Sequence, residues 1–135
     1  MTKAQRSYCM SRVRGKDTSL ELLVRSALHR RGRRFFKHCR HLPGRPDVVF
    51  PSCKVAVFLD GDFWHGYRFP RWAGRLKPYW RAKIAGNRRR DRRNFRRLRA
   101  MGWRVVRVWE HQALHDLEGC IERVEKAVLP AHVPH

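Results

Sequence analysis

Two carboxylates adjoin apolar, strand-like runs in the first half of the chain. Asp47 follows Gly-Arg-Pro and precedes Val-Val-Phe, and Asp60 ends a second apolar run, Val-Ala-Val-Phe-Leu. A carboxylate beside buried apolar residues is costly unless its charge is compensated, so each acid needs a partner. Nearby backbone amides would suffice for an isolated strand-end acid. Two acids at the same end of a hairpin could instead hold a hard divalent cation through oxygen ligands.

The register between the two runs decides whether these acids can cooperate. One register pairs Phe50 with Lys54. It places Asp47 on the face of Leu59, with Asp60 pointing to the other face. A slip of one residue moves Asp60 to the same face as Asp47, because side chains alternate along a strand. The sequence leaves both registers open.

A loop with three aromatic rings and a histidine follows the second acid. Phe63, Trp64 and His65 stand between Gly61 and Gly66, and Tyr67 comes next. Such rings are costly to expose to water. They could fill the core and leave His65 as a bystander. They could also stack on bases or enter between them, as apolar side chains do in proteins that deform a duplex.

The positive charge of the chain indicates a polyanionic partner. Its 135 residues carry 32 Lys and Arg against 11 Asp and Glu, a net charge of +21. Between Arg75 and Arg99 there are ten Arg and two Lys with one acid, Asp91. Contact with phosphates releases condensed counterions, which favours nucleic acid. An anionic membrane surface is a weaker match, because an interfacial helix needs a broader apolar face.

The elements that would position these residues follow from periodicity. Thr18-Ser-Leu-Glu21 forms a capping box, and apolar residues at helical spacing continue to a stop at Gly32. Strand-like runs cover 34–38, 46–50 and 54–60, and the segment 61–77 is irregular. A long helix begins at Pro78 and ends at Gly102, and it is followed by a Val-rich strand over 103–109 and a last helix. The seam of the long helix is formed by Trp80, Ile84, Asp91, Phe95 and Leu98, and that of the last helix by Leu117, Ile121, Val124 and Val128.

The order αβββαβα predicts an α/β fold, a three-layer sandwich with a central mixed β-sheet between helices. The length suits one domain over residues 1–135, with a basic arm at 1–16 and a core at 17–129. No run approaches the roughly 20 apolar residues that a membrane span needs. The N-terminal residues do not read as a signal peptide, and the four cysteines form no CxxC pair. We therefore expect a cytoplasmic protein with reduced, structural cysteines and no membrane partner.

Several motifs in this order are similar to those of the very short patch repair endonucleases. They are MSRVRGKDTSLE, LPGRPDVVF, DGDFWHG and the run from PYWRAKIAGN to GWRVVRVWE, so the resemblance spans roughly residues 7–115. It implies a restriction-endonuclease-like αβββαβ core and a Mg²⁺-dependent endonuclease. Such an enzyme nicks one strand of duplex DNA beside a mispaired base, with T·G the expected mispair. It also implies a bacterial, nucleoid-associated monomer that could work with DNA repair proteins.

The resemblance also implies roles for single residues. Asp47 would be the carboxylate ligand of Mg²⁺, with the backbone carbonyl of Leu59. Glu21 would hydrogen-bond water on the metal, although its capping-box role competes with this one. His65 would act at the scissile phosphate as acid, base or electrostatic stabiliser, since an imidazole exchanges protons near neutral pH. Contacts with DNA would be made by Met10, Phe63, Trp64, Trp80, Lys83 and Asn87, and by the arginines of the basic helix, Arg88 and Arg89 among them.

Two positions depart from the family pattern. Members of the family can carry histidine where this chain has Asp60, so Asp60 is a candidate second metal ligand as well as a candidate catalytic residue. The structural zinc site of the family uses Cys and His at positions that correspond to Asp62, Tyr67, Phe69 and His111. Because a structural zinc needs four closed ligands, we expect no zinc here. Two alternatives remain: a restriction-type nuclease acting on matched duplex, and a non-enzymatic basic protein that binds nucleic acid.

Overall fold

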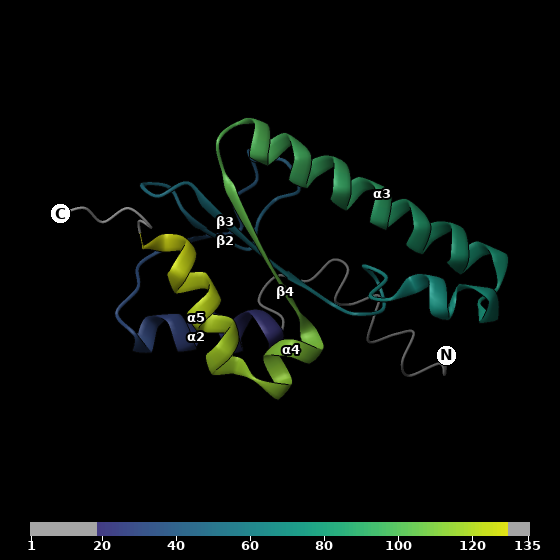
Figure 1. Cartoon of the computed structure of the whole chain (residues 1–135), viewed down its shortest axis with the longest axis horizontal. Helices are drawn as coiled ribbons and strands as arrows, with labels where there is room; N and C mark the ends of the chain where they lie inside the picture. The colour runs from purple at the N-terminus through teal and green to yellow at the C-terminus, as the bar shows by residue number, and fades with distance from the viewer. Residues whose placement is uncertain (1–18, 130–135) are drawn as a thin grey trace.

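A computed structural model describes residues 19–129 of the chain. The basic arm, Met10, Cys9 and the capping-box residue Thr18 lie outside the described residues. A central sheet separates two layers of helices (Figure 1). None of the helices within 19–129 combines the length and the apolar composition that crossing a membrane requires.

The sheet has four strands in the order β1-β2-β3-β4: β1 (Phe36–Lys37), β2 (Val48–Phe50), β3 (Val55–Asp60) and β4 (Arg104–Trp109). β1, β2 and β3 pair antiparallel, whereas β3 and β4 are parallel. The predicted mixed sheet is confirmed. The parallel pair places the C-terminal ends of β3 and β4 at the same edge, with Asp60 opposite Trp109.

Helices cover both faces of this sheet. α2 (Ser19–Arg30) and α5 (Leu117–Val128) pack on one face, around Val48, Val57 and Leu59. The long helix α3 (Pro78–Ala100) covers the other face, where Phe95 and Leu98 pack against Val49, Ala56 and Phe58. The two apolar clusters confirm the three predicted layers (Figure 1).

The structure decides the register that the sequence left open. Phe50 pairs with Val55, not with Lys54, so the second register is the one formed. Lys54 has a left-handed backbone, with φ of 55°, and belongs to the turn. The connection therefore contains four residues instead of the three expected. By strand alternation, Asp47 and Asp60 then belong to the face that α3 covers.

Most predicted elements are present, with shorter strands. The strand expected over 34–38 is reduced to Phe36–Lys37, because His38 has a positive φ of 54° and leaves the extended conformation. A short helix absent from the prediction, α4 (Glu110–His115), follows β4. The irregular segment contains two 3₁₀ turns, η1 (Phe69–Arg71) and η2 (Ala73–Arg75). The first and last helices and the long helix begin and end close to the predicted residues.

Candidate active site

A cavity of about 510 Å³ opens at the C-terminal end of β3, between the sheet and α3. Four separate parts of the chain form its walls: α2, the segment before β2, the end of β3 with the loop that follows it, and α3 as far as Asp91. The residues predicted from sequence that line it are Glu21, Asp47, Leu59, Asp60, Trp64, His65, Lys83 and Asn87. The structure therefore brings together all four predicted catalytic residues and both firm metal-binding positions.

Asp47 reaches the cavity from the residue before β2. Its Oδ2 atom accepts a hydrogen bond from the Leu59 amide at 2.7 Å, and its own amide donates to the Val57 carbonyl at 3.0 Å. The backbone of β3 therefore presents the carbonyl of Val57 and the amide of Leu59 to Asp47. In an extended strand the N–H and C=O of one residue point to the same side, so the Leu59 carbonyl also faces Asp47.

The electrostatics of Asp47 are those of a carboxylate in need of a cation. Burial raises the pKa of Asp47 to about 8; the hydrogen bond from Leu59 opposes this rise, and the charges of Asp60 and Glu21 add to it. Within residues 19–129, Asp47 forms no ion pair. A carboxylate and a carbonyl side by side are the oxygen donors that Mg²⁺ prefers, so this pair fits a hard cation.

Glu21 lies in the first turn of α2 and is buried, with 5% of its surface exposed. Its Oε2 atom accepts from Arg25 Nη1 at 3.2 Å and lies 3.5 Å from His38 Nε2. Glu21 also lines the cavity with Asp47. The position of the Glu21 carboxylate is compatible with the predicted hydrogen bond to metal-bound water. The capping-box partner Thr18 lies outside the described residues.

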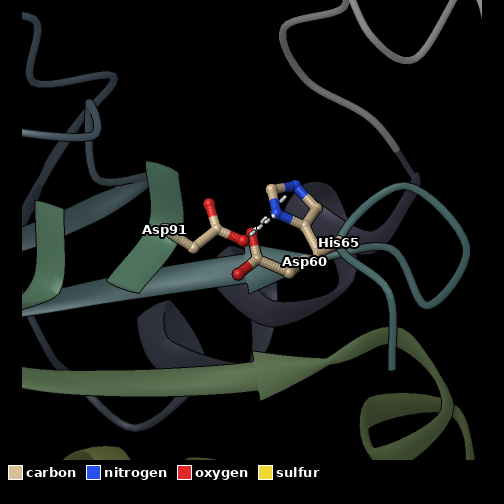
Figure 2. Close-up of side chains that lie close together, drawn as sticks. All are labelled: Asp60, His65 and Asp91. Carbon is tan, nitrogen blue, oxygen red and sulfur yellow. Dashed lines mark hydrogen bonds and ion pairs between the residues drawn. The ribbon is translucent and has the colours of Figure 1, made fainter. Parts of the chain in front are cut away.

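Asp60 and His65 form a compact ionic cluster with a second acid, Asp91 of α3 (Figure 2). His65 Nδ1 lies 2.7 Å from Asp91 Oδ2, and His65 Nε2 lies 3.4 Å from Asp60 Oδ1. Arg107 of β4 contacts both acids: Nε donates to Asp60 Oδ2 and Nη2 to Asp91 Oδ2, each at 2.7 Å. Two carboxylates, one guanidinium and one imidazole therefore share one network.

The network affects how its members ionise. Burial lowers the pKa of His65, but the hydrogen bond to Asp91 and the charge of Asp60 outweigh it and raise the pKa above 6.5. Burial raises the pKa of Asp60, and His65 and Arg107 oppose that rise. Ligand atoms of Asp60, His65 and Asp91 all lie within 4.8 Å of one another, a spacing that could hold a metal ion. In this structure Arg107 already provides a positive charge there.

The loop after β3 places His65 and Trp64 against α3. Gly66 has a positive φ of 70°, and a Cβ atom there would lie 2.7 Å from Arg88 Cδ. Glycine therefore permits the loop to approach the helix this closely. Asn87 Nδ2 donates to the Trp64 carbonyl at 2.9 Å and holds the loop from the other side. This contact gives Asn87 a structural task besides its predicted DNA contact.

The predicted DNA-contacting rings form one aromatic cluster beside the cavity. The Trp64 ring centroid lies 5.3 Å from that of Phe63 and 5.6 Å from that of Trp80. All three side chains are half-buried. The Trp64 Nε1–H is buried, and within the described residues it has no hydrogen-bond acceptor. An unpaired buried donor costs free energy, which an acceptor on a bound partner would recover.

The predicted basic contacts divide into two groups. Lys83 and Arg89 are exposed on α3 and free to meet a phosphate. The Arg88 guanidinium instead lies over the Phe69 ring, 5.4 Å from its centroid, and its side chain is half-buried. Met10, which is also a predicted DNA contact, lies outside the described residues.

Three of the four positions that the resemblance assigns to a zinc site, Asp62, Tyr67 and His111, come close together, but with other chemistry. His111 Nδ1 lies 2.9 Å from Asp62 Oδ1, and the Tyr67 ring packs against His111 with centroids 4.3 Å apart. Phe69 is buried and packs edge-on against Trp72. Only Asp62 and His111 offer strong zinc ligands, fewer than the four that a structural site needs. The ion pair between Asp62 and His111 and the packing of Tyr67 on His111 connect the loop after β3 with α4.

A second hollow, of about 1020 Å³, lies between the end of α2 and the β2–β3 turn. Among the described residues its walls include Phe35, Phe50 and Cys53 with His29 and two arginines, but no carboxylate. It therefore lacks the acids that metal-dependent hydrolysis requires, and the smaller cavity is the candidate active site.

Sequence reasoning missed two members of the site, Asp91 and Arg107. Asp91 was assigned to the apolar seam of the long helix, whose other members are aromatic or aliphatic. A single acid among ten arginines, on the buried side of a helix, was the signal that could have identified it. Arg107 interrupts the strand Val-Val-Arg-Val-Trp, where an arginine that is even partly buried likewise needs an anionic partner.

Comparison with known proteins gives consistent matches over most of the chain. The family model described as DNA mismatch endonuclease Vsr matches residues 1–71. The Type II nicking enzyme V.XorIIP of Xanthomonas oryzae pv. oryzae is 41% identical over 133 residues, 97% of each chain. The Type II nicking enzyme V.NmeDIP of Neisseria meningitidis serogroup C is 37% identical, over 95% of this chain and 88% of its own. The DNA mismatch endonuclease Vsr of Escherichia coli K12 is 39% identical, over 92% of this chain and 83% of its own.

Proposed function

The chain belongs to the Vsr DNA mismatch endonuclease family, and from this premise we propose that it is a Mg²⁺-dependent endonuclease that nicks one DNA strand beside a mispaired base. The observation that carries the proposal is the single cavity that gathers Asp47, Glu21 and His65 from three separate segments. A T·G mispair is the proposed lesion.

Asp47 and the Leu59 carbonyl would hold the metal, and Glu21 would accept a hydrogen bond from a water molecule on it. When bound, Mg²⁺ polarises the phosphate and makes water a better nucleophile. The half-buried carboxylate of Asp47, which has no ion-pair partner within residues 19–129, and the direction of the Leu59 backbone support this assignment. Mg²⁺ keeps several of its waters, so two protein ligands are enough.

His65 would act as an acid or as a positive charge at the scissile phosphate. Its pKa is raised above the ordinary value of an imidazole, chiefly by the hydrogen bond to Asp91, and this increases the share of the imidazolium form at a given pH, which favours the roles of acid and of positive charge over that of general base. Nδ1 is held closely by Asp91, whereas Nε2 has a longer contact of 3.4 Å with Asp60. Nε2 is therefore the nitrogen that can exchange its partner for a phosphate oxygen.

DNA binding would rest on the exposed arginines of α3 and on the aromatic cluster of Phe63, Trp64 and Trp80. The arginines contact phosphates without regard to sequence. The rings would enter the duplex where it opens most easily, and a mispaired step costs less to unstack than a matched one. In this proposal affinity comes mainly from charge, and selectivity for the mispair comes from deformability.

The proposal includes the organisation of the chain. Residues 1–135 form a single nuclease domain, in which 1–16 are a DNA-binding arm and 17–129 a core of the restriction-endonuclease type. The protein acts as a monomer on chromosomal DNA in the bacterial cytoplasm, where DNA repair proteins are possible partners. The four-stranded mixed sheet with helices on both faces supports this fold assignment.

A cleavage assay on end-labelled duplexes tests the function. Duplexes of one sequence carry each possible mispair or none, and they are incubated with Mg²⁺, with EDTA, and with EDTA followed by excess Mg²⁺. We expect a nick in one strand of the mispaired duplex alone, lost with EDTA and restored by Mg²⁺. Equal cleavage of the matched duplex would indicate a restriction-type enzyme instead.

Asp47→Asn separates the enzyme from a protein that only binds nucleic acid. This variant keeps the shape of the side chain and an acceptor for the Leu59 amide, but loses the charge that a metal requires. Nicking should disappear while the affinity for DNA stays the same or increases. Binding by the parent chain without cleavage of any duplex would support the basic binding protein.

A further inference from the structure

Arg107 is placed where it can set the geometry of the whole ionic cluster. It lies on β4, opposite Phe58 of β3, and its side chain has 23% of its surface exposed. Its Nε and Nη2 atoms, which lie on one edge of the guanidinium, bond to Asp60 and Asp91 respectively, each at 2.7 Å. One side chain thus connects an acid from the sheet with an acid from the helix that covers it.

Two aromatic rings hold the guanidinium in its orientation. Its central carbon lies 4.0 Å from the ring centroid of Trp109 and 5.0 Å from that of Phe95. Trp109 belongs to the same strand, whereas Phe95 is one turn after Asp91 on α3. A planar group that stacks on rings and a rigid edge with two parallel donors are properties of arginine that lysine lacks.

The position of His65 depends on the two acids that Arg107 connects. Asp91 Oδ2 receives Arg107 Nη2 and faces His65 Nδ1 at the same distance, 2.7 Å. Asp60 presents Oδ2 to Arg107 and Oδ1 to His65 Nε2. Removal of the guanidinium would leave two carboxylates, Asp60 buried and Asp91 half-buried, with oxygen atoms within 4.8 Å of each other, and like charges at that spacing repel.

We propose that Arg107 is the positioning residue of this site: its guanidinium fixes Asp60 and Asp91 so that His65 is presented to the cavity. This inference rests on the proposed function. It concerns a residue that does not itself contact the phosphate. It also assigns Asp60 to the support of His65, because the two oxygens of Asp60 serve Arg107 and His65.

The test compares Arg107→Lys and Arg107→Gln with the parent chain and with Arg104→Gln as a matched control. Arg104 lies on the same strand, is exposed, and bonds to the Ala127 carbonyl away from the cavity. The single-turnover nicking rate and the Kd for mispaired duplex are measured for each. Both Arg107 variants should lose about 10- to 100-fold in rate, at or below the lower end of the roughly 10²- to 10⁴-fold that an acid–base group itself contributes, with Kd changed less than about threefold. Arg104→Gln should change neither markedly.

Three outcomes would overturn the proposal. Full activity of Arg107→Lys would show that charge alone suffices. A proportional loss of rate and affinity would make Arg107 a DNA contact. If Arg107→Gln fails to fold, Asp60→Asn/Arg107→Gln removes the acid together with its partner and is measured instead. Normal nicking by this folded double variant would also reject the positioning role.

A spectroscopic measurement separates this inference from the proposed function. The ¹H–¹⁵N signals of the His65 ring, assigned by their loss in His65→Ala, report the bond from Nδ1 to Asp91 without any substrate. They should shift or broaden in Arg107→Lys and remain unchanged in Arg104→Gln. Unchanged signals in both variants would reject the role of Arg107. Absence of nicking by the parent chain would reject the proposed function and leave this test intact.

Discussion

His65 Nδ1 lies 2.7 Å from Asp91 Oδ2, although 26 positions separate the two residues in the chain. His65 stands in the loop after β3 and Asp91 in the middle of α3, so packing of the long helix onto the sheet creates the pair. The pair holds Nδ1 against Asp91 and leaves Nε2 with the longer contact of 3.4 Å to Asp60. The contact with Asp91 also raises the pKa of His65, so the imidazolium loses its proton at a higher pH.

Asp91→Asn should lower the pKa of His65 in the metal-free protein. Burial already lowers this pKa, and the hydrogen bond and charge of Asp91 are needed to raise it above 6.5. The native network therefore stabilises the fold below pH 6.5, and this contribution is lost as the pH rises through the folded-state pKa. An NMR titration of the histidine ring signals measures the change. An identical His65 titration in both proteins would contradict the assigned bond.

Asp47→Asn should stabilise the metal-free protein at pH 8. The pKa of Asp47 is raised from 3.8 to about 8, chiefly by burial, so the native carboxyl makes the fold less stable as the pH increases across that interval. We expect a gain on the order of 1–3 kcal/mol at pH 8, below the full pKa difference because solvent screens part of the burial cost. Chemical denaturation at pH 4 and pH 8 measures it, and the gain should vanish at pH 4.

Trp64→Ala should reduce the preference for mispaired over matched duplex, because the ring that would enter the opened step is lost. Trp64→Phe is the matched control: it keeps an aromatic ring but removes the Nε1–H, which has no acceptor among the described residues. We expect roughly a tenfold loss of preference for the alanine variant, from about 1–3 kcal/mol of stacking, and a smaller loss for phenylalanine. Unchanged preference in Trp64→Ala would assign this ring to the core alone.

Arg89→Gln should weaken DNA binding equally for matched and mispaired duplexes. Arg89 is exposed on α3, where it can neutralise one phosphate. The slope of log K against log salt concentration should become shallower by about 0.9, the value for one phosphate contact. Fluorescence anisotropy at several salt concentrations measures this slope. Arg104→Gln, at the start of β4, should leave the slope unchanged, and equal slopes for the parent chain and both variants would remove Arg89 from the interface.

The sequence by itself determined the local elements and most of the residues with chemical capacity. Helical spacing, Pro78 and Gly102 predicted the helices, and Val-rich runs predicted the strands, because these signals depend on near neighbours. The acids Asp47 and Asp60 and the imidazole His65 were recognisable as polar groups beside apolar runs. The family resemblance added their expected roles, which the tests above address.

Only the tertiary structure decided which of these groups meet. β2 and β3 are buried on both faces, so their uniformly apolar sequence carried no alternation from which the register of Phe50 could be read. The left-handed turn residue Lys54 set that register, and a shift of one residue would have sent Asp60 to the opposite face. The contacts of Asp91 and Arg107 likewise arise from a parallel strand pair and a long helix packed across it. Such contacts join residues far apart in the chain, and their energies are absent from any local pattern.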